Sequence, residues 1–134
     1  MEKLLEVEIV TPQKPIFKGT ATSVSLPGEL APFQILYNHA PIFSSLVPGV
    51  VYIASENSKQ IFAITRGFVS SQENKVVVCV EKAYSKEELD KDKLDARLAE
   101  LRQKIKSATS EKEKQEIKSL INEVKAQLLA LEKD

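Results

Sequence analysis

Short apolar runs alternate with turn residues through the first 84 residues, a pattern typical of an all-β domain. Each run is rich in β-branched or aromatic side chains, and period-two alternation is clear in Val7-Glu8-Ile9 and over residues 22–26. The runs cover residues 5–11, 16–18, 21–26, 33–36, 43–47, 50–55, 60–65, 68–71 and 76–81. Strands of this length and spacing predict a β-sandwich or barrel of short antiparallel strands.

The last run differs from the others in having no polar alternation. After Lys75 it reads Val-Val-Val-Cys-Val, which predicts a strand covered on both faces. Cys79 lies within it, so we expect a core thiol. The residues just before, Glu73-Asn74-Lys75, predict a tight hairpin turn.

Two amphipathic helices are predicted for the rest of the chain. Apolar residues recur at intervals of three and four, which places them on one stripe of each helix. The first stripe is Leu94, Leu98, Leu101 and Ile105, and the second is Ile117, Leu120 or Ile121, Val124, Leu128 and Leu131. Residues 107–110 break the pattern, so we expect an antiparallel two-helix hairpin.

The helix starts carry capping residues. Ser110-Glu111-Lys112-Glu113 fits a capping box for the second helix. For the first helix, either Asp90 or Ser85 together with Glu88 could form the cap, and the sequence leaves both possible.

Amino-acid composition also changes at the boundary between the predicted strands and the predicted helices. All six prolines and all four glycines lie in the first half, and no aromatic residue follows Tyr84. The sequence therefore predicts a β-sandwich domain over residues 1–84 and a helical hairpin domain over residues 85–134.

Charge and cysteine content limit the partners and the cellular compartment that we expect for this chain. Nineteen basic and nineteen acidic residues cancel, which argues against nucleic acid as a partner. Cys79 is the single cysteine, and the opening Met1-Glu2-Lys3 is unlike a signal segment, so we expect a reducing, cytosolic setting without disulfides. Residues 30–55 carry no charge, but prolines and polar residues interrupt them, so no membrane-spanning helix is expected there.

Candidates for catalysis or metal binding are few. The single histidine, His39, lies in the turn-like Asn38-His39-Ala40-Pro41, where we expect a turn residue rather than a general base. One Cys and one His cannot make a zinc site, and Pro27-Gly28-Glu29 lacks the lysine and spacing of a phosphate-binding loop. The chain is expected to have no catalytic site, no metal and no cofactor.

The order of the motifs resembles the epsilon subunit of bacterial F-type ATP synthase. The specific block is Asn38-His39-Ala40-Pro41 in its spacing, whereas the helical half is generic and only its position after the β half is informative. The matching segments are residues 10–12, 16–19, 24–28, 33–41, 46–51, 67–69 and 74–78.

The resemblance implies a non-catalytic rotor subunit in the central stalk. It would bind the gamma subunit and the ring of c subunits, beside the alpha and beta subunits, and would link proton or sodium flow to ATP synthesis. Its place would be peripheral, on the cytoplasmic side of the bacterial plasma membrane. The residues that the resemblance assigns to subunit contacts are Gly28, Glu29, Phe33, His39 and Pro41.

The resemblance also implies two regulatory features of the hairpin. Its second helix would inhibit ATP hydrolysis through basic residues, for which the chain offers Lys112, Lys114, Lys118 and Lys125, although interleaved glutamates are expected to dilute a basic face. Some family members bind ATP on the hairpin, and Asp90 and Lys93 occupy two positions of that motif. Because Lys93 replaces an arginine that would bind phosphate bidentately, ATP binding is disfavoured.

A different class of protein fits part of the pattern. A free-standing β-domain could bind a partner while its helices form a coiled-coil dimer. Four or five apolar positions per helix and the break at residues 107–110 favour an intramolecular hairpin instead.

Overall fold

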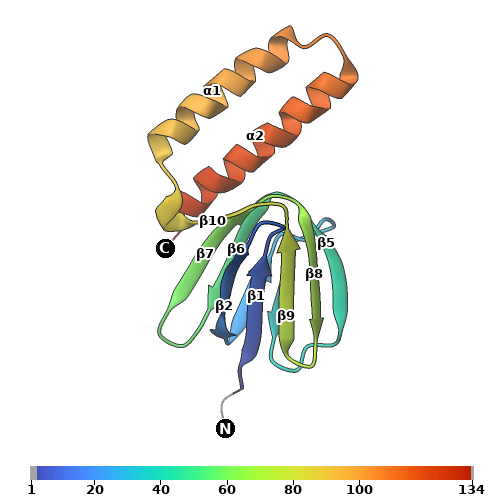
Figure 1. Cartoon of the computed structure of the whole chain (residues 1–134), viewed down its shortest axis with the longest axis vertical. Helices are drawn as coiled ribbons and strands as arrows, with labels where there is room; N and C mark the ends of the chain where they lie inside the picture. Colours follow the sequence, from blue (N-terminus) through green and yellow to red (C-terminus); the bar gives the residue numbers. More distant parts are fainter. Residues whose placement is uncertain (1–2, 134) are drawn as a thin grey trace.

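The computed structural model describes residues 3–133 as a β-sandwich with a helical hairpin over one end (Figure 1). Met1 and Glu2, on which the expectation about a signal segment partly depends, lie outside the described residues. Neither described helix combines the length and the apolarity needed to cross a bilayer.

Ten strands form two five-stranded sheets. The first sheet has the order β2 (Pro15–Ala21), β1 (Leu5–Val10), β9 (Lys75–Val80), β8 (Gly67–Gln72) and β5 (Ile42–Leu46). The second has the order β10 (Ala83–Ser85), β7 (Lys59–Ile64), β6 (Gly49–Ala54), β3 (Ser23–Leu26) and β4 (Phe33–Leu36). The predicted sandwich is confirmed, with β2 and β5 at the edges of the first sheet and β10 and β4 at the edges of the second.

Three details differ from the prediction. β1 pairs with β9 in parallel, whereas every other neighbouring pair is antiparallel. β2 is longer than predicted because Gly19 and Thr20 continue the ladder opposite β1. β10 was not predicted, since a three-residue strand is too short to show alternation.

The core lies between the inner faces of the sheets. Val7, Val24, Ile35, Val69 and Val78 are fully buried in it, in agreement with the alternation along their strands. At its margin the rings of Phe17 and Phe62 meet edge to face with centroids 5.6 Å apart.

β9 corrects one expectation. Val76, Val78 and Val80 are buried, but Val77 and Cys79 on the outer face are only half-buried. Cys79 is therefore not a core thiol, because this strand is covered on one face rather than two. The hairpin turn before it is confirmed, since Glu73 and Asn74 both have positive φ and Gln72 pairs with Lys75.

Both alternative caps are used, at different elements. Ser85 donates its hydroxyl and its N–H to the carboxylate of Glu88 around a 3-10 turn, η1 (Lys86–Glu88). Asp90 then caps α1 (Lys91–Ser107), and Ser110 caps α2 (Glu111–Glu132) by accepting from the N–H of Glu113.

The two helices pack along a shared apolar stripe, which we call the seam. Leu101, Ile117 and Val124 are buried at its centre, with Ile121 rather than Leu120 completing it. Leu131, also predicted for the seam, is half-buried outside this cluster. The stripes therefore satisfy each other within one chain, as an antiparallel hairpin requires.

The C-terminal end of α2 packs on the outer face of the second sheet. Ala130 is fully buried there against Val50, Ile61 and Ala63, with Tyr52 and Leu89 beside them. The Lys86 ammonium donates to the Lys133 carbonyl, which supplies a positive charge at the end of α2. The N-terminal half of α2 rises away from the sandwich (Figure 1).

We predict that Gly67→Ala lowers the free energy of unfolding by about 2 kcal/mol, the cost of overpacking a site that cannot relax. A Cβ at Gly67 would press on the Cys79 carbonyl and lie 2.7 Å from the Cα of Val80, and both are backbone atoms that cannot move alone. Urea unfolding measures the effect. Gly19→Ala is the control, because its Cβ meets only the movable ring of Phe17 at 3.0 Å, and an equal loss in both variants would contradict the argument.

Candidate subunit interface

One side of the sandwich carries most of the exposed apolar surface. This uncharged side is formed by the edge strands β4 and β5 with their flanking loops, which come from the charge-free residues 30–55. Of the eight large hydrophobic side chains exposed in the described chain, six lie here or on the neighbouring β8. They are Leu30, Leu36, Tyr37, Phe43, Val47 and Phe68.

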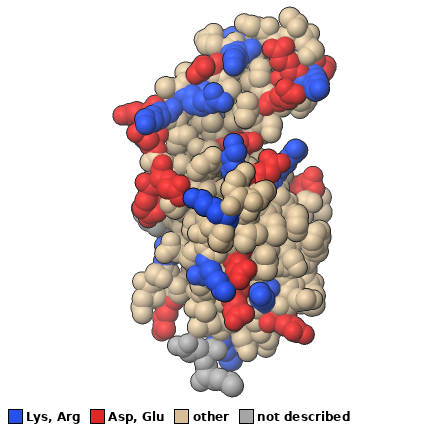
Figure 2. Space-filling model, viewed as in Figure 1, with Lys and Arg blue, Asp and Glu red and all other residues tan. Residues whose placement is uncertain are grey.

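Two aromatic rings form the centre of this surface. Phe43 on β5 is 70 % exposed and Phe68 on β8 is 41 % exposed. The register sets Phe43 opposite Ser70 and Phe68 opposite Ser45, so the two rings are diagonal neighbours on the outer face, 5.1 Å apart between centroids. Figure 2 shows mostly uncharged surface on the side of the sandwich that β5 and β8 occupy in Figure 1, while Lys, Arg, Asp and Glu lie on the hairpin and on the rest of the visible sandwich face. Exposed aromatic rings without charge between them are typical of protein-binding surfaces.

A groove of about 810 Å³ continues this surface toward the hairpin. Val47, Phe68 and Cys79 line it from the sandwich, and Ser119 borders it from α2. Arg66 and Glu81 stand at its rim as an exposed ion pair, 3.5 Å between Nε and Oε1. The apolar surface therefore extends from the edge strand to the space below the hairpin.

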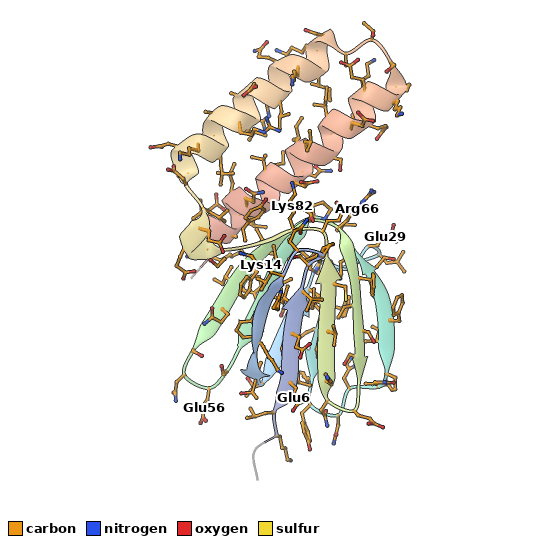
Figure 3. The ribbon with its side chains drawn as sticks, in the orientation of Figure 1. Glu6, Lys14, Glu29, Glu56, Arg66 and Lys82 are labelled. Carbon is orange, nitrogen blue, oxygen red and sulfur yellow. The ribbon has the colours of Figure 1, made fainter. Side chains whose placement is uncertain are left out.

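The residues predicted for subunit contacts divide between the two ends of the sandwich. Glu29 lies at the hairpin end, near Arg66 (Figure 3), where its N–H donates to the Ser45 carbonyl. Gly28 bridges to Leu46 at the same end. His39 and Pro41 lie at the opposite end, where β4 leads into β5.

The loop at the hairpin end is held in place at its base. A Cβ on Gly28 would lie 2.5 Å from the Ala31 carbonyl oxygen and 2.8 Å from the ring of Phe33, so the ring covers this glycine. Leu30 at the tip is fully exposed. A fixed base below an exposed apolar tip gives a rigid projection.

His39 lies in a fixed turn, as predicted. Its N–H donates to the Leu36 carbonyl, and its ring Nδ1 lies 2.7 Å from the Ala40 carbonyl. A carbonyl can only accept, so Nδ1 is the donor in this contact. Asn38 and Asn74, both with positive φ, exchange hydrogen bonds of 2.6 and 3.3 Å and tie this turn to the β8–β9 turn.

Three of the four predicted inhibitory lysines share one face of α2. Lys114, Lys118 and Lys125 are separated by four and seven residues, which aligns them along the helix. By the same spacing Glu116 and Glu123 lie on a different face, together with Lys112. The expected dilution of the basic face is therefore limited, although Glu111 does pair with Lys114 at 3.9 Å.

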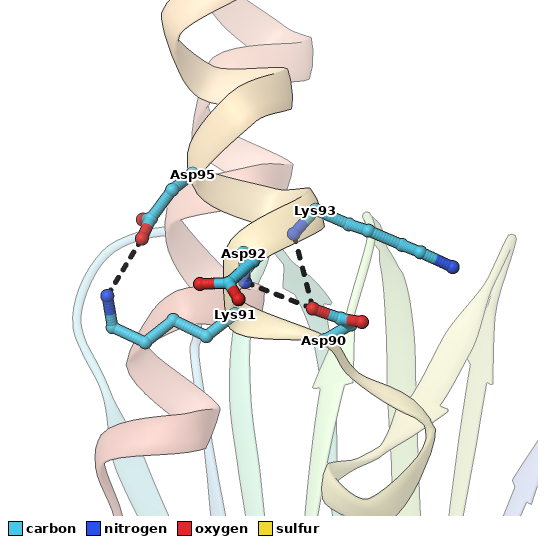
Figure 4. Close-up of polar contacts among 5 residues, drawn as sticks. All are labelled: Asp90, Lys91, Asp92, Lys93 and Asp95. Atoms are coloured by element: carbon cyan, nitrogen blue, oxygen red, sulfur yellow. Dashed lines mark hydrogen bonds and ion pairs between the residues drawn. The ribbon is translucent and has the colours of Figure 1, made fainter.

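The Asp90 carboxylate is engaged as a helix cap. It accepts from the N–H groups of Asp92 and Lys93 at 3.0 and 3.2 Å, while the ammonium end of Lys93 points away from it (Figure 4). Next to it Lys91 pairs with Asp95 at 2.8 Å, and this hydrogen bond raises the pKa of Lys91. Asp90 and Lys93 do not converge on one point in this arrangement.

Sequence reasoning missed Phe43 and Phe68 as candidate interface residues. Their signal was present, because both are bulky residues that alternate with inward-facing ones on strands whose other outward positions are serine or glutamine. Within residues 3–133, no three His, Cys, Asp or Glu side chains come close enough to hold a metal ion.

The fold defines a structural class: a two-sheet β-sandwich with an uncharged side and a helical hairpin that rests on an outer sheet face. The family model for the "ATP synthase, Delta/Epsilon chain, beta-sandwich domain" matches residues 4–86. The chain therefore belongs to the family of ATP synthase epsilon chains, which are non-catalytic subunits of the central stalk.

Similar proteins agree with this assignment. The chain is 32 % identical over 118 residues to the ATP synthase epsilon chain of Nitratidesulfovibrio vulgaris, covering 83 % of this chain and 88 % of that one. It is 36 % identical over 109 residues to the epsilon chain of Nitratiruptor sp., covering 81 % and 84 %. A chain of the Euglena gracilis mitochondrial ATP synthase has the same fold, with a TM-score of 0.86 at 19 % identity over 98 % of this chain and 83 % of that one.

We predict that Asp90→Ala destabilises the hairpin by about 1 kcal/mol, since two N–H groups lose their acceptor. Helix content followed by circular dichroism during heating measures the loss. Asp92→Ala is the matched control, because Asp92 lies in the first turn without capping it, and an equal effect in both variants would refute the capping role.

Proposed function

We propose that this chain is the rotor subunit that joins gamma to the c-ring of an F-type ATP synthase and that its hairpin inhibits ATP hydrolysis. Its partners are gamma, the c-ring and the alpha and beta subunits, and the coupling ion is a proton or sodium. The subunit is attached peripherally, on the cytoplasmic side of the plasma membrane. Residues 1–84 and 85–134 act as a docking domain and a regulatory domain.

The observation that carries this proposal is the Phe43–Phe68 pair on the uncharged side. Fully burying one exposed Phe contributes about 1.5–3 kcal/mol. Phe43 is 70 % exposed and Phe68 41 %, so a partner that covers both rings gains part of that energy from each. Gamma is the partner that we assign to this surface. A chain of the central stalk and c-ring of the Tetrahymena thermophila mitochondrial ATP synthase has the same fold, with a TM-score of 0.65 at 17 % identity.

The projecting loop at the hairpin end is the part that we assign to the c-ring. Gly28, Glu29 and Phe33 shape its base, and Leu30 forms its tip. His39 and Pro41, at the opposite end, then belong to the surface around gamma.

Inhibition would come from the aligned lysines of α2. Lys114, Lys118 and Lys125 form a positive stripe that could meet an acidic segment of a catalytic subunit when the hairpin leaves the sandwich. Lys112 lies outside the stripe and contributes less. ATP as a ligand of Asp90 and Lys93 remains disfavoured, because the Asp90 carboxylate already accepts two N–H groups.

We predict that Phe43→Ser weakens binding to purified gamma about tenfold, which corresponds to about 1.4 kcal/mol of lost burial. Isothermal titration of gamma with the full chain measures it. Leu129→Ser removes another exposed apolar side chain, which lies on α2, and should leave the affinity unchanged. Equal affinities of gamma for the wild-type chain and for the Phe43 variant would contradict the assignment of gamma to this surface.

We also predict that replacing Lys114, Lys118 and Lys125 by Gln raises ATP hydrolysis by the assembled complex several-fold, because the positive stripe is lost. Hydrolysis is measured after reconstitution with the variant chain. Replacing Lys3, Lys18 and Lys59 on the sandwich removes the same charge elsewhere and should have no effect. Unchanged hydrolysis with the α2 variant would end the inhibitory assignment for these residues.

A further inference from the structure

The contact between α2 and the sandwich rests on small residues. Ala126 and Ala130 are the buried residues of the C-terminal part of α2 outside the seam, and small side chains let the helix approach the sheet closely. The contact also encloses the Tyr52 hydroxyl, which is buried and lacks a hydrogen-bond partner among the described residues. An unsatisfied hydroxyl costs free energy, so this contact is not optimised for stability.

Glu123 lies one turn before Ala126 and two turns before Ala130, at the edge of the same contact. Its side chain is half-buried, and its helix neighbours three and four residues away are uncharged. Those neighbours are Ser119, Leu120, Ala126 and Gln127. Glu123 therefore has no ion-pair partner of opposite charge at these positions of its own helix.

The charged groups that face Glu123 all come from the top of the sandwich. They are Arg66 after β7 and the neighbouring Glu81 and Lys82 after β9, and Figure 3 shows Arg66 and Lys82 beneath α2. Arg66 already pairs with Glu81, so its charge is shared. Burial raises the pKa of Glu123 above its ordinary value of 4.5, and Glu81 adds to the shift while Lys82 and Arg66 oppose it.

We propose that the contact of α2 with the sandwich is a proton-sensitive latch, in which protonation of Glu123 strengthens docking of the hairpin and ionisation weakens it. The carboxyl group binds its proton more tightly when the hairpin is docked than when it is exposed on a free helix. Docking is therefore strongest at low pH and weakens as the pH rises from 4.5 through the raised pKa of the docked state. This inference concerns the isolated chain and holds or fails independently of the assignment to gamma or the c-ring.

The test is a pH titration of the full chain by NMR, with ¹³C labels on the Glu side-chain carboxyls and the Ala methyls. We expect the Glu123 carboxyl to titrate above its ordinary pKa of 4.5, because docking buries it. Over the same range the Ala130 methyl signal should move from its docked position beside Tyr52 toward that of a free helix. One proton can change the ratio of docked to undocked chains by at most about tenfold per pH unit.

Two variants distinguish titration of Glu123 from non-specific effects of pH on the hairpin. Glu123→Gln should keep the Ala130 methyl docked throughout this pH range, because a neutral amide takes the place of the protonated acid. Glu116→Gln is the matched control and should behave like the wild-type chain. The proposal is overturned if the Ala130 signal does not respond while Glu123 titrates, if Glu123 titrates at its ordinary pKa of 4.5, or if Glu123→Gln keeps the wild-type pH response.

Discussion

The aliphatic layer between the two sheets determines which surfaces of this molecule remain for binding. Each strand gives one face to that layer, through residues such as Val7, Val24 and Val78. A strand has only two faces, so the outer positions must be solvated, covered or used. Whether an outer face is charged, covered or apolar therefore decides which surfaces are open to a partner.

Three solutions to that constraint appear on the outer faces. β1 and β2 carry charges there, and Glu8 and Lys18 form an exposed ion pair of 3.7 Å. β6 and β7 are covered by the end of α2 through Ala130. β5 and β8 have neither charge nor cover and expose Phe43 and Phe68 instead. An uncharged edge strand is a liability in a free monomer, so a covering partner is the physical explanation that the proposed function offers.

Much of this fold could be predicted from the chain. Alternation located most strands, and the three-four spacing of leucines located both helices, because each pattern directly reflects which face is buried. The parallel pairing of β1 with β9 and the short β10 could not be predicted, since pairing partners far apart in sequence leave no local pattern. Cys79 was misplaced because a run of apolar residues does not reveal whether one face or two is covered. The separation of Glu29 from His39 likewise depends on topology, which the motifs alone do not contain.

The central claim is that the uncharged side of the sandwich binds gamma. Its most direct test is a photo-crosslinking amino acid at position 43, introduced into the full chain within its own membranes, followed by mass spectrometry of the crosslinked peptides. The account predicts crosslinks from position 43 to gamma, and none from the same probe at position 129 on α2. Crosslinks from position 43 to another protein, or an absence of crosslinks to gamma in assembled complexes, would contradict it.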